Sequence, residues 1–386
     1  MKNLLFIGWY PNPIEKYKNV FFQNLIYEIA RLGYSCTVIS PVSYMKYRKS
    51  ICQIPLHYED RLEENVVVDT YYPRTVSASS IQLGSFNTEH ISEECFERAA
   101  LRCAKLLGRK FDCVYGHFFL YGGLAAVRIG RELGIPSFIA YGECDFDSQV
   151  YQTFGTPKEK HLKGLSGIIS VSSKNTKELL DMNFVPNIPI ITEPNAVDNK
   201  VFFKKDRASC RESLGLPQDK FIVGFVGGFI ERKGDKRLLK AAEELDDVYL
   251  AFAGRGDTPP QGKKVLFCRG LEHQDICTFL NAVDVFCLPT LSEGSCNAVA
   301  EAMACGCAII SSALPFNDDV LTDENSVRID PSSVEEIRSA IWLLKENPAL
   351  RNTVATNALK DSKSHTIINR ANRIITFIES AEKQKI

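Results

Sequence analysis

The sequence predicts an α/β protein with two doubly wound, Rossmann-like domains, each built on a mainly parallel sheet. Short apolar runs of strand length alternate with amphipathic helical stretches along almost the whole chain, which is typical of strands joined by crossover helices. The chain has 386 residues, and at roughly 150 residues per domain this length suits two domains. A turn-rich segment, 194–198, separates two series of such elements and is the predicted linker.

The first series begins almost at the first residue. Its apolar runs predict strands at 4–8, 35–40, 66–71, 113–115, 137–141, 167–171 and 188–192, and helices at 21–32, 91–107, 122–133 and 174–181. The second series predicts strands at 221–226, 248–253, 265–268, 285–289 and 308–311, and helices at 235–245, 275–281, 297–304 and 334–345. A last helix over 367–378 follows the second sheet, and the sequence does not indicate where it packs.

Composition excludes several classes of protein. The 46 Lys and Arg residues nearly balance the 47 Asp and Glu residues, so the overall positive charge that favours nucleic-acid binding is missing. No apolar run reaches the ~18 residues of a membrane-spanning helix, and the short run Leu4–Ile7 does not match a secretory signal, so we expect a cytoplasmic protein. The 13 cysteines include no Cys-x-x-Cys pair, which predicts reduced core residues and no metal cofactor.

A glycine-containing loop, 227–234, joins the strand at 221–226 to the following helix. Gly227 and Gly228 allow a ligand to approach the backbone, the N–H groups of the helix attract anions, and Lys233 adds a full positive charge. The loop matches neither the Walker A pattern nor the dinucleotide fingerprint. It indicates a phosphate site, with a glycine turn beside a solvated lysine as the alternative.

A second segment, 288–306, carries carboxylates at a helix N-terminus. Glu293 follows a predicted strand, and Asn297 and Glu301 are four residues apart on one face of the next helix. A diphosphate at that N-terminus would meet backbone N–H groups, and Glu301 could accept hydrogen bonds from neighbouring hydroxyls such as those of a ribose. The alternatives are a helix-terminal charge for Glu293 and a solvated position for Glu301, whose small apolar neighbours disfavour solvation.

These segments resemble the retaining GT-B glycosyltransferases, the large group 1 family. The resemblance rests on Glu293 and Glu301 with seven residues between them, the run 302–306 (AMACG), the Lys233-Gly234 loop and the motif Asn195-x-Val-Asp198. In the first half, four weaker motifs are similar to members that build bacterial surface polysaccharides: Gly8-Trp-Tyr-Pro-Asn, Phe21-Phe-Gln, His117-Phe-Phe-x-x-Gly-Gly and Gly134-Ile-Pro.

The resemblance implies two domains facing across a cleft. It implies an acceptor-binding domain at 1–198, a nucleotide-sugar-binding domain at 199–365, and a helix at 366–386 that crosses back to the first domain. It makes Glu293 and Lys233 catalytic, with His117 and Tyr141 on the acceptor side. The implied donor-binding residues are Gly227, Gly228, Arg232, Lys233, Arg269, Gly270, Leu271, Glu293, Gly294, Ser295, Cys296, Asn297, Ala298 and Glu301.

The family's residue roles carry over as follows. Lys233 would neutralise the diphosphate, Glu301 would bind the ribose, and Glu293 would contact sugar hydroxyls near the anomeric carbon. The segment Arg269–Leu271 lies where the family cradles the base. We therefore expect a retaining, metal-independent transfer from a nucleotide-diphosphate sugar to a hydroxyl of a glycan or lipid-linked acceptor, in surface polysaccharide biosynthesis.

Two positions depart from the family pattern. Gly228 stands where an arginine usually grips phosphate, although Arg232 could replace it, and Tyr141 stands where a histidine is common. These departures leave two alternatives open. One is a catalytically silent protein that binds sugar nucleotides or glycans, and the other is a GT-B nucleotide-sugar epimerase.

Two further segments carry weaker patterns. Asp145 and Asp147 have a spacing that can hold a divalent cation, but the glycine-containing loop already supplies positive charge for a diphosphate, so we expect no metal. Residues 44–49 combine two tyrosines with Lys46, Arg48 and Lys49. This segment could dock on anionic headgroups at the inner face of a membrane, and an ordinary solvated loop is the alternative.

Overall fold

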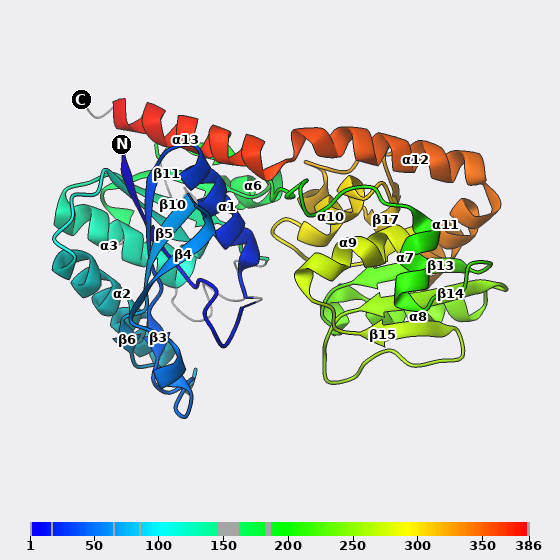
Figure 1. Cartoon of the computed structure of the whole chain (residues 1–386), viewed down its shortest axis with the longest axis horizontal. Helices are drawn as coiled ribbons and strands as arrows, with labels where there is room; N and C mark the ends of the chain where they lie inside the picture. Colours follow the sequence, from blue (N-terminus) through cyan, green and yellow to red (C-terminus); the bar gives the residue numbers. More distant parts are fainter. Residues whose placement is uncertain are drawn as a thin grey trace. The chain divides into compact units, whose positions relative to one another are not determined.

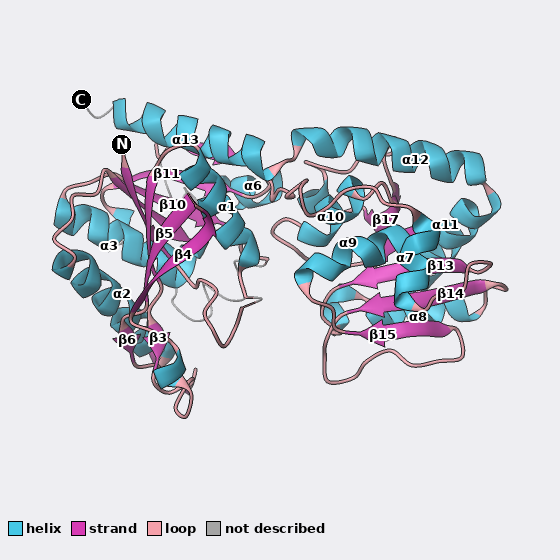
Figure 2. Cartoon of the chain, in the orientation of Figure 1, coloured by secondary structure: helices cyan, strands magenta, loops and turns pink. Residues whose placement is uncertain are grey.

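The computed structural model of the chain describes residues 2–16, 18–64, 66–84, 86–144, 162–181 and 187–383 (Figure 1). The chain forms two compact units: an N-terminal unit, Met1–Glu193 with Arg370–Ile386, and a C-terminal unit, Pro194–Asn369. Each unit contains a largely parallel sheet accompanied by helices (Figure 2). The predicted α/β fold class is therefore confirmed.

The N-terminal unit is built on an eight-stranded sheet in the order β12-β11-β10-β9-β1-β2-β5-β4. Its strands are β1 (Asn3–Ile7), β2 (Ser35–Ile39), β4 (His57–Glu63), β5 (Val66–Tyr71), β9 (Cys113–His117), β10 (Ser137–Tyr141), β11 (Leu165–Ser170) and β12 (Ile190–Thr192). Its helices are α1 (Val20–Arg31), α2 (Glu89–Leu106), α3 (Leu124–Leu133), α6 (Ser173–Asp181) and most of α13 (Ile367–Lys383). Two small pairs complete it: β3 (Val42–Ser43) with β6 (Arg74–Thr75), and β7 (Gln82–Leu83) with β8 (Phe86–Asn87).

The C-terminal unit is built on a six-stranded sheet in the order β15-β14-β13-β16-β17-β18. Its strands are β13 (Phe221–Val226), β14 (Val248–Ala253), β15 (Val265–Arg269), β16 (Val285–Leu288), β17 (Ala308–Ser312) and β18 (Val327–Ile329), all paired in parallel. Its helices are α7 (Arg207–Leu214), α8 (Asp235–Glu243), α9 (His273–Ala282), α10 (Asn297–Ala304), α11 (Val334–Glu346) and α12 (Pro348–Asp361).

Burial explains why most strands could be predicted and a few could not. Residues 4–7 of β1 and all of β16 are buried, as expected for strands covered on both faces, and both were predicted from their apolar runs. By contrast, β4 is a polar antiparallel strand at the sheet edge with no buried residue, and α12 buries only Val354 and Ala358. Neither β4 nor α12 carries an apolar pattern, so the sequence analysis missed both, together with α7, β18 and the two small strand pairs.

The last helix packs on the N-terminal unit from Arg370 onward. Arg373 Nε donates to both carboxylate oxygens of Glu193 at 2.8 and 2.7 Å, and Tyr34 donates its hydroxyl to Glu379 at 2.9 Å. The ring of Phe377 lies against Gly167, where a β-carbon would come within 2.7 Å of it. The close approach of α13 to the sheet thus depends on a residue without a side chain.

Two predictions drawn from composition can be compared with the structure. All 13 cysteines are free thiols, and most of them are buried, as predicted. Among the described residues, every helix is too short or too polar to cross a membrane.

Candidate functional site

The C-terminal sheet changes direction between β13 and β16. From β13 the order runs outward through β14 and β15 on one side, and through β16, β17 and β18 on the other. In open parallel sheets, ligands bind beyond the carboxyl ends of the strands at such a point. The loops that leave β13 and β16 there are the two segments that the sequence analysis singled out, 227–234 and 289–296.

A cluster of charged side chains joins these two loops. Glu293 Oε1 accepts from Arg232 Nη1 at 2.9 Å and from the hydroxyl of Thr290 at 2.9 Å, and it forms an ion pair with Lys233 Nζ. The Arg232 carbonyl accepts from Leu291 N at 2.9 Å, which ties the loop backbones together. The structure therefore brings Lys233, Arg232 and Glu293 into one group.

Glu293 and Lys233 are largely withdrawn from solvent. Their side chains are 8% and 18% exposed. Burial alone would lower the pKa of Lys233, but the neighbouring groups Cys296 and Glu293 outweigh burial and raise this pKa above the ordinary value. Lys233 is therefore charged across the whole physiological range, as a group that binds a diphosphate must be.

Gly234 allows the 227–234 loop to lie close to the loop that begins at Pro289. Its φ is +82°, and a β-carbon there would lie 2.5 Å from the carbonyl oxygen of Pro289. Gly228 is different, because a β-carbon there would meet only the carbonyl oxygen of Arg255, at 3.8 Å. Gly234 is thus required by geometry, whereas position 228 has room for a side chain.

Helix α10 begins at Asn297 and points its N-terminus toward the same loop. The side chain of its N-cap residue, Cys296, makes no capping hydrogen bond, and the Asn297 Oδ1 atom is buried without a partner among the described residues. Ser295 is fixed instead by the linker, because its hydroxyl accepts from Asn195 N at 3.0 Å. The N-terminus of α10 therefore retains hydrogen-bonding groups for an anionic or hydroxyl-bearing ligand.

Glu301 has a partner that the sequence analysis missed. Its Oε1 atom lies 3.1 Å from His273 Nε2, on the first residue of α9, and the Glu301 side chain is only 13% exposed. Burial would lower the pKa of His273, but the hydrogen bond and charge of Glu301, with Asp198, raise it. A single histidine at the start of a helix matches no sequence motif. The pair between His273 and Glu301 could therefore be found only from the structure.

The segment Arg269–Leu271 begins at the last residue of β15, at the same edge of the sheet. Arg269 lies over the ring of Phe267, with 4.8 Å between the guanidinium carbon and the ring centroid. Gly270 lies against Arg255, which forms an ion pair with Glu272 at 3.3 Å. The sequence did not predict Arg255 as a site residue, because it lies in a loop without a recognised motif.

The N-terminal sheet has its own change of direction, between β9 and β1. His117 ends β9 at this edge and is buried, with its ring stacked on Phe22 at 4.2 Å between centroids. Burial, aided by the charge of Arg370, lowers the pKa of His117 to about 3. The ring is therefore neutral at physiological pH.

Tyr141, the other residue predicted on the acceptor side, ends β10 and is completely buried. Its hydroxyl donates to Glu178 at 3.0 Å. In this structure both His117 and Tyr141 lie beneath the surface of the unit.

The turn after His117 is strained and is held by a residue that the sequence analysis missed. Phe118 and Tyr121 have φ values of +65° and +58°, a conformation that costs energy for residues with side chains. The Glu143 carboxylate accepts from Phe119 N at 2.6 Å and from Gly142 N at 3.0 Å. Burial, only partly opposed by these hydrogen bonds, raises the pKa of Glu143 to about 7.

A small aromatic pocket of about 190 Å³ opens beside this turn, lined by loops that follow β1 and β2. Trp9 is 37% exposed and packs on Tyr121 and Phe96, with ring centroids 5.0 and 6.2 Å apart. Lys46 lies on the wall and donates to Glu15 at 2.8 Å. An exposed tryptophan ring beside hydrogen-bonding groups suits a sugar-like ligand.

Asp145 and Asp147 lie outside the residues that the structure describes. In the segment 44–49, Lys46, Arg48 and Lys49 are exposed, whereas Tyr47 is buried and joins a hydrophobic cluster.

Comparison with known proteins agrees with this architecture. Residues 206–361 match the family described as glycosyl transferases group 1. The matched range includes the Lys233–Glu293 cluster, Glu301 and His273. The resemblance noted from the sequence is thereby confirmed.

Two curated relatives extend the match. TuaC of Bacillus subtilis (strain 168), whose name assigns it provisionally as a teichuronic acid biosynthesis glycosyltransferase, is 25% identical over 358 residues, covering 88% of each protein. A D-inositol 3-phosphate glycosyltransferase of Mycobacterium bovis (strain BCG / Pasteur 1173P2) is 24% identical over 229 residues, and the match spans 53% of this chain and 47% of that protein. The chain thus spans about half the length of the second relative.

Solved structures show the same fold over the whole chain. Sucrose-phosphate synthase from Thermosynechococcus elongatus is 17% identical, with a TM-score of 0.78 and full coverage of both chains. Anabaena Alr3699/HepE in complex with UDP is 13% identical, with a TM-score of 0.73 over 98% of this chain and 100% of that chain. The chain therefore has the GT-B fold.

Proposed function

We propose that this protein is a retaining, metal-independent glycosyltransferase of surface polysaccharide biosynthesis. It would move a sugar from a nucleotide-diphosphate sugar to a hydroxyl group of a glycan or lipid-linked acceptor. The observation that carries the proposal is the cluster of Lys233, Arg232 and Glu293 at the point where the C-terminal sheet changes direction. The names of TuaC and of the UDP complex of HepE support a polysaccharide product and a nucleotide donor.

In the proposed donor complex, the diphosphate lies between the 227–234 loop and the N-terminus of α10. In the structure Lys233 and Arg232 both pair with Glu293, and in the complex they would turn toward the phosphates. The N–H groups of residues 294–298 would complete the site. Glu301 would bind the ribose, and the segment Arg269–Leu271 would border the base. The positive charge in this site supports catalysis without a bound metal ion.

The chemical step replaces one bond at the anomeric carbon with another on the same face of the sugar. The bond from this carbon to the diphosphate oxygen breaks, and its electron pair leaves with the diphosphate. The acceptor oxygen bonds to the same carbon, and its proton passes to the departing phosphate, as in the related family. Lys233 stabilises the developing phosphate charge, and Glu293 orients the sugar hydroxyls once its two cations engage the diphosphate.

On the acceptor side, we assign the N-terminal unit. The aromatic pocket at Trp9 and the turn held by Glu143 support this assignment, because both lie at the carboxyl ends of that unit's strands. His117 and Tyr141 would act from beneath this surface by supporting the turn. Lys46, Arg48 and Lys49 are exposed for contact with anionic lipid at the inner membrane face, and Lys46 also pairs with Glu15.

The function can be tested by incubating the purified protein with several nucleotide-diphosphate sugars and measuring release of free nucleoside diphosphate. Slow release without acceptor, accelerated by a crude glycan or lipid-linked acceptor fraction, is the expected result. Interconversion of the donor sugar without release would identify an epimerase instead. Tight binding without any turnover would identify a silent binding protein.

Metal independence is tested in the same assay. Activity should survive EDTA, because Lys233, Arg232 and the N-terminus of α10 meet the phosphate charge. Loss of activity with EDTA and its restoration by Mg²⁺ or Mn²⁺ would contradict this part of the proposal and direct attention to Asp145 and Asp147.

A further inference from the structure

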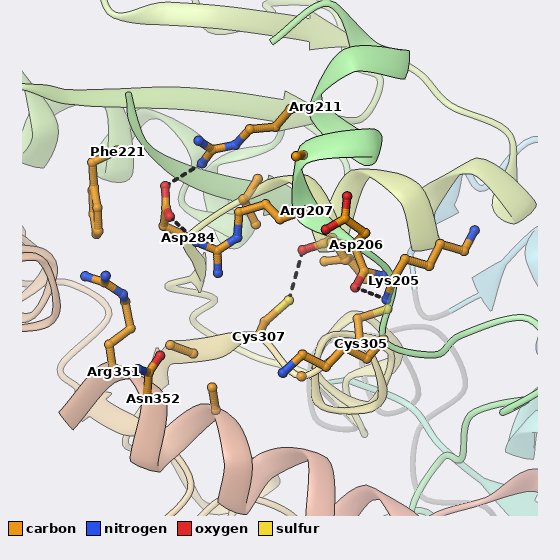
Figure 3. A pocket seen from close by; sticks show the side chains of 18 of the residues that line it. Lys205, Asp206, Arg207, Arg211, Phe221, Asp284, Cys305, Cys307, Arg351 and Asn352 are labelled. Atoms are coloured by element: carbon orange, nitrogen blue, oxygen red, sulfur yellow. Dashed lines mark hydrogen bonds and ion pairs between the residues drawn. The ribbon is translucent and has the colours of Figure 1, made fainter. Parts of the chain in front are cut away.

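A large hollow of about 980 Å³ lies in the C-terminal unit at the amino ends of its strands (Figure 3). Its lining includes Phe221 and Ala308, the first residues of β13 and β17, and Asp284, which directly precedes β16. The proposed donor site lies at the carboxyl ends of the same parallel strands. This basic hollow is therefore a separate surface, at the opposite edge of the sheet.

The hollow has a local excess of positive charge, although the whole chain has almost no net charge. Its lining holds six basic and three acidic side chains, an excess of three positive charges, whereas the formal charge of the whole chain is -1. The basic residues are Lys204, Lys205, Arg207, Arg211, Lys220 and Arg351, and the acidic ones are Asp206, Asp219 and Asp284.

The acidic residues are already engaged in the fold. Asp206 caps α7 by accepting from Ser209 N at 2.9 Å, and Asp219 pairs with Lys220 at 3.3 Å. Asp284 Oδ2 accepts from the buried Arg211 and from the backbone N of Ile222, at 2.6 and 2.8 Å. These carboxylates thus stabilise local structure and offset only part of the positive charge.

Three cations from different segments border the remaining space. Arg207 on α7 reaches Asp284 Oδ1 at 2.6 Å, so it shares this carboxylate with Arg211, and its side chain is 50% exposed. Arg351 on α12 lies over Phe221, 5.2 Å from the ring centroid, and Lys204 is exposed beside Gly306. Figure 3 shows Arg207 and Arg351 extending from opposite walls into the hollow.

The titration of Arg351 agrees with this geometry. Burial lowers its pKa, and the charge of Arg207 lowers it further, whereas Asp284 opposes the shift. Burial and the charge of Arg207 thus together outweigh the attraction of Asp284, and a further anion beside Arg351 would favour its charged form.

We propose that the basic hollow binds a phosphate-bearing ligand, through Arg207, Arg351 and Lys204. Guanidinium groups match phosphate oxygens in pairs, and the volume of the hollow is in the range of small-molecule sites rather than that of one small ion. The phosphates can belong to a free phosphorylated compound or to a phospholipid headgroup, since both present the same chemistry. The proposal does not depend on the proposed glycosyl transfer.

The first arm of the test is calorimetric titration with inorganic tripolyphosphate at low salt. In Lys204→Ala/Arg207→Ala the dissociation constant at this site should rise roughly tenfold or more, because charge-assisted hydrogen bonds are lost. The control, Lys240→Ala/Arg98→Ala, removes one lysine and one ion-paired arginine outside the hollow and should bind like the parent. Lys233→Ala should still bind tripolyphosphate in the hollow, which would show that the hollow and the donor loop are separate sites.

The second arm is co-sedimentation with phosphatidylglycerol vesicles. Sedimentation that disappears in Lys204→Ala/Arg207→Ala but not in the control assigns the phosphates to lipid, whereas tripolyphosphate binding without sedimentation assigns them to a free compound. Lys204→Glu, at an exposed position, serves as a second variant if the double variant unfolds. The proposal is overturned if the parent binds neither probe, or if the hollow variants bind both probes as the parent does.

Discussion

In the C-terminal unit, the loops at the point where the sheet changes direction contain glycines and bring Lys233, Arg232 and Glu293 together. The corresponding edge of the N-terminal unit carries a neutral, buried His117, a strained turn at Phe118 and an aromatic pocket at Trp9. The sheets share one architecture, but their loops provide different chemistry. One edge suits a multiply charged ligand, and the other suits an uncharged ligand with apolar ring faces.

The largest expected effect concerns the charge at the C-terminal edge. Lys233→Ala should slow sugar transfer roughly a hundredfold, because charge builds on the diphosphate as the bond breaks. Single-turnover rates of the parent and of the variant measure this effect. Lys240→Ala, at an exposed position of the following helix α8, is the matched control. An unchanged rate in Lys233→Ala would remove this residue from its proposed role.

A somewhat smaller effect is expected at Glu301. Replacement by Ala would remove the proposed hydrogen bonds to the ribose, worth roughly 1.5 to 3 kcal/mol, so affinity for the nucleoside diphosphate should fall about tenfold or more. Isothermal calorimetry measures this affinity. His273→Ala should keep most of the affinity, because it removes the partner of Glu301 but leaves the carboxylate. Equal binding by Glu301→Ala and the parent would contradict the assignment.

The loop backbone allows a paired test of stability. Gly234→Ala should lower the free energy of unfolding by about 1 to 3 kcal/mol, because it forces a β-carbon against Pro289 in a left-handed conformation. Gly228→Ala should change stability by less than about 0.5 kcal/mol, since its β-carbon would make only an ordinary van der Waals contact with the Arg255 carbonyl oxygen. Urea unfolding measures both. Similar losses in the two variants would show that the loop moves to accommodate either side chain.

The N-terminal edge should affect the acceptor rather than the donor. Trp9→Ala should raise the KM for the acceptor several-fold, because stacking on an aromatic ring is worth roughly 1 kcal/mol. Donor hydrolysis without acceptor should stay at the parent rate. Kinetics with both substrates varied separate these effects. A change in donor KM alone would reverse the proposed assignment of the two edges.

The smallest effect is a pH dependence of stability at His273. The pKa of this histidine is raised in the folded protein, so its pair with Glu301 stabilises the fold below the ordinary histidine pKa and is lost as pH rises through the folded-state pKa. Since His273 is 37% exposed, solvent screening limits the contribution to about 0.5 kcal/mol. Urea unfolding at acidic and alkaline pH, compared with His273→Gln, measures it. An identical pH profile in the variant would exclude the contribution.

The comparison of the two edges also shows where sequence reasoning succeeds. The residues from Gly227 to Glu301 that form the site lie in loops between a strand and a helix. Because these loops follow parallel strands at the same edge of the sheet, the sequence pattern could predict that they lie close together. His273, Arg255 and Glu143 lie at no motif, and their roles depend on neighbours that are distant in the sequence. Polar β4 and weakly patterned α12 were missed because the patterns that predict elements measure burial, and these elements bury little.

The packing of α13 has a consequence for how the chain is made. Glu193 and Arg373 are 180 positions apart, yet they form one ion pair inside the N-terminal unit. During synthesis, the first half of the chain leaves the ribosome with Gly167 and Phe138 uncovered, because Phe377, which packs against both, has not yet been translated. The unit that begins first is therefore completed last, after the C-terminal unit has been fully synthesised. A fragment ending at residue 193 would expose this apolar surface.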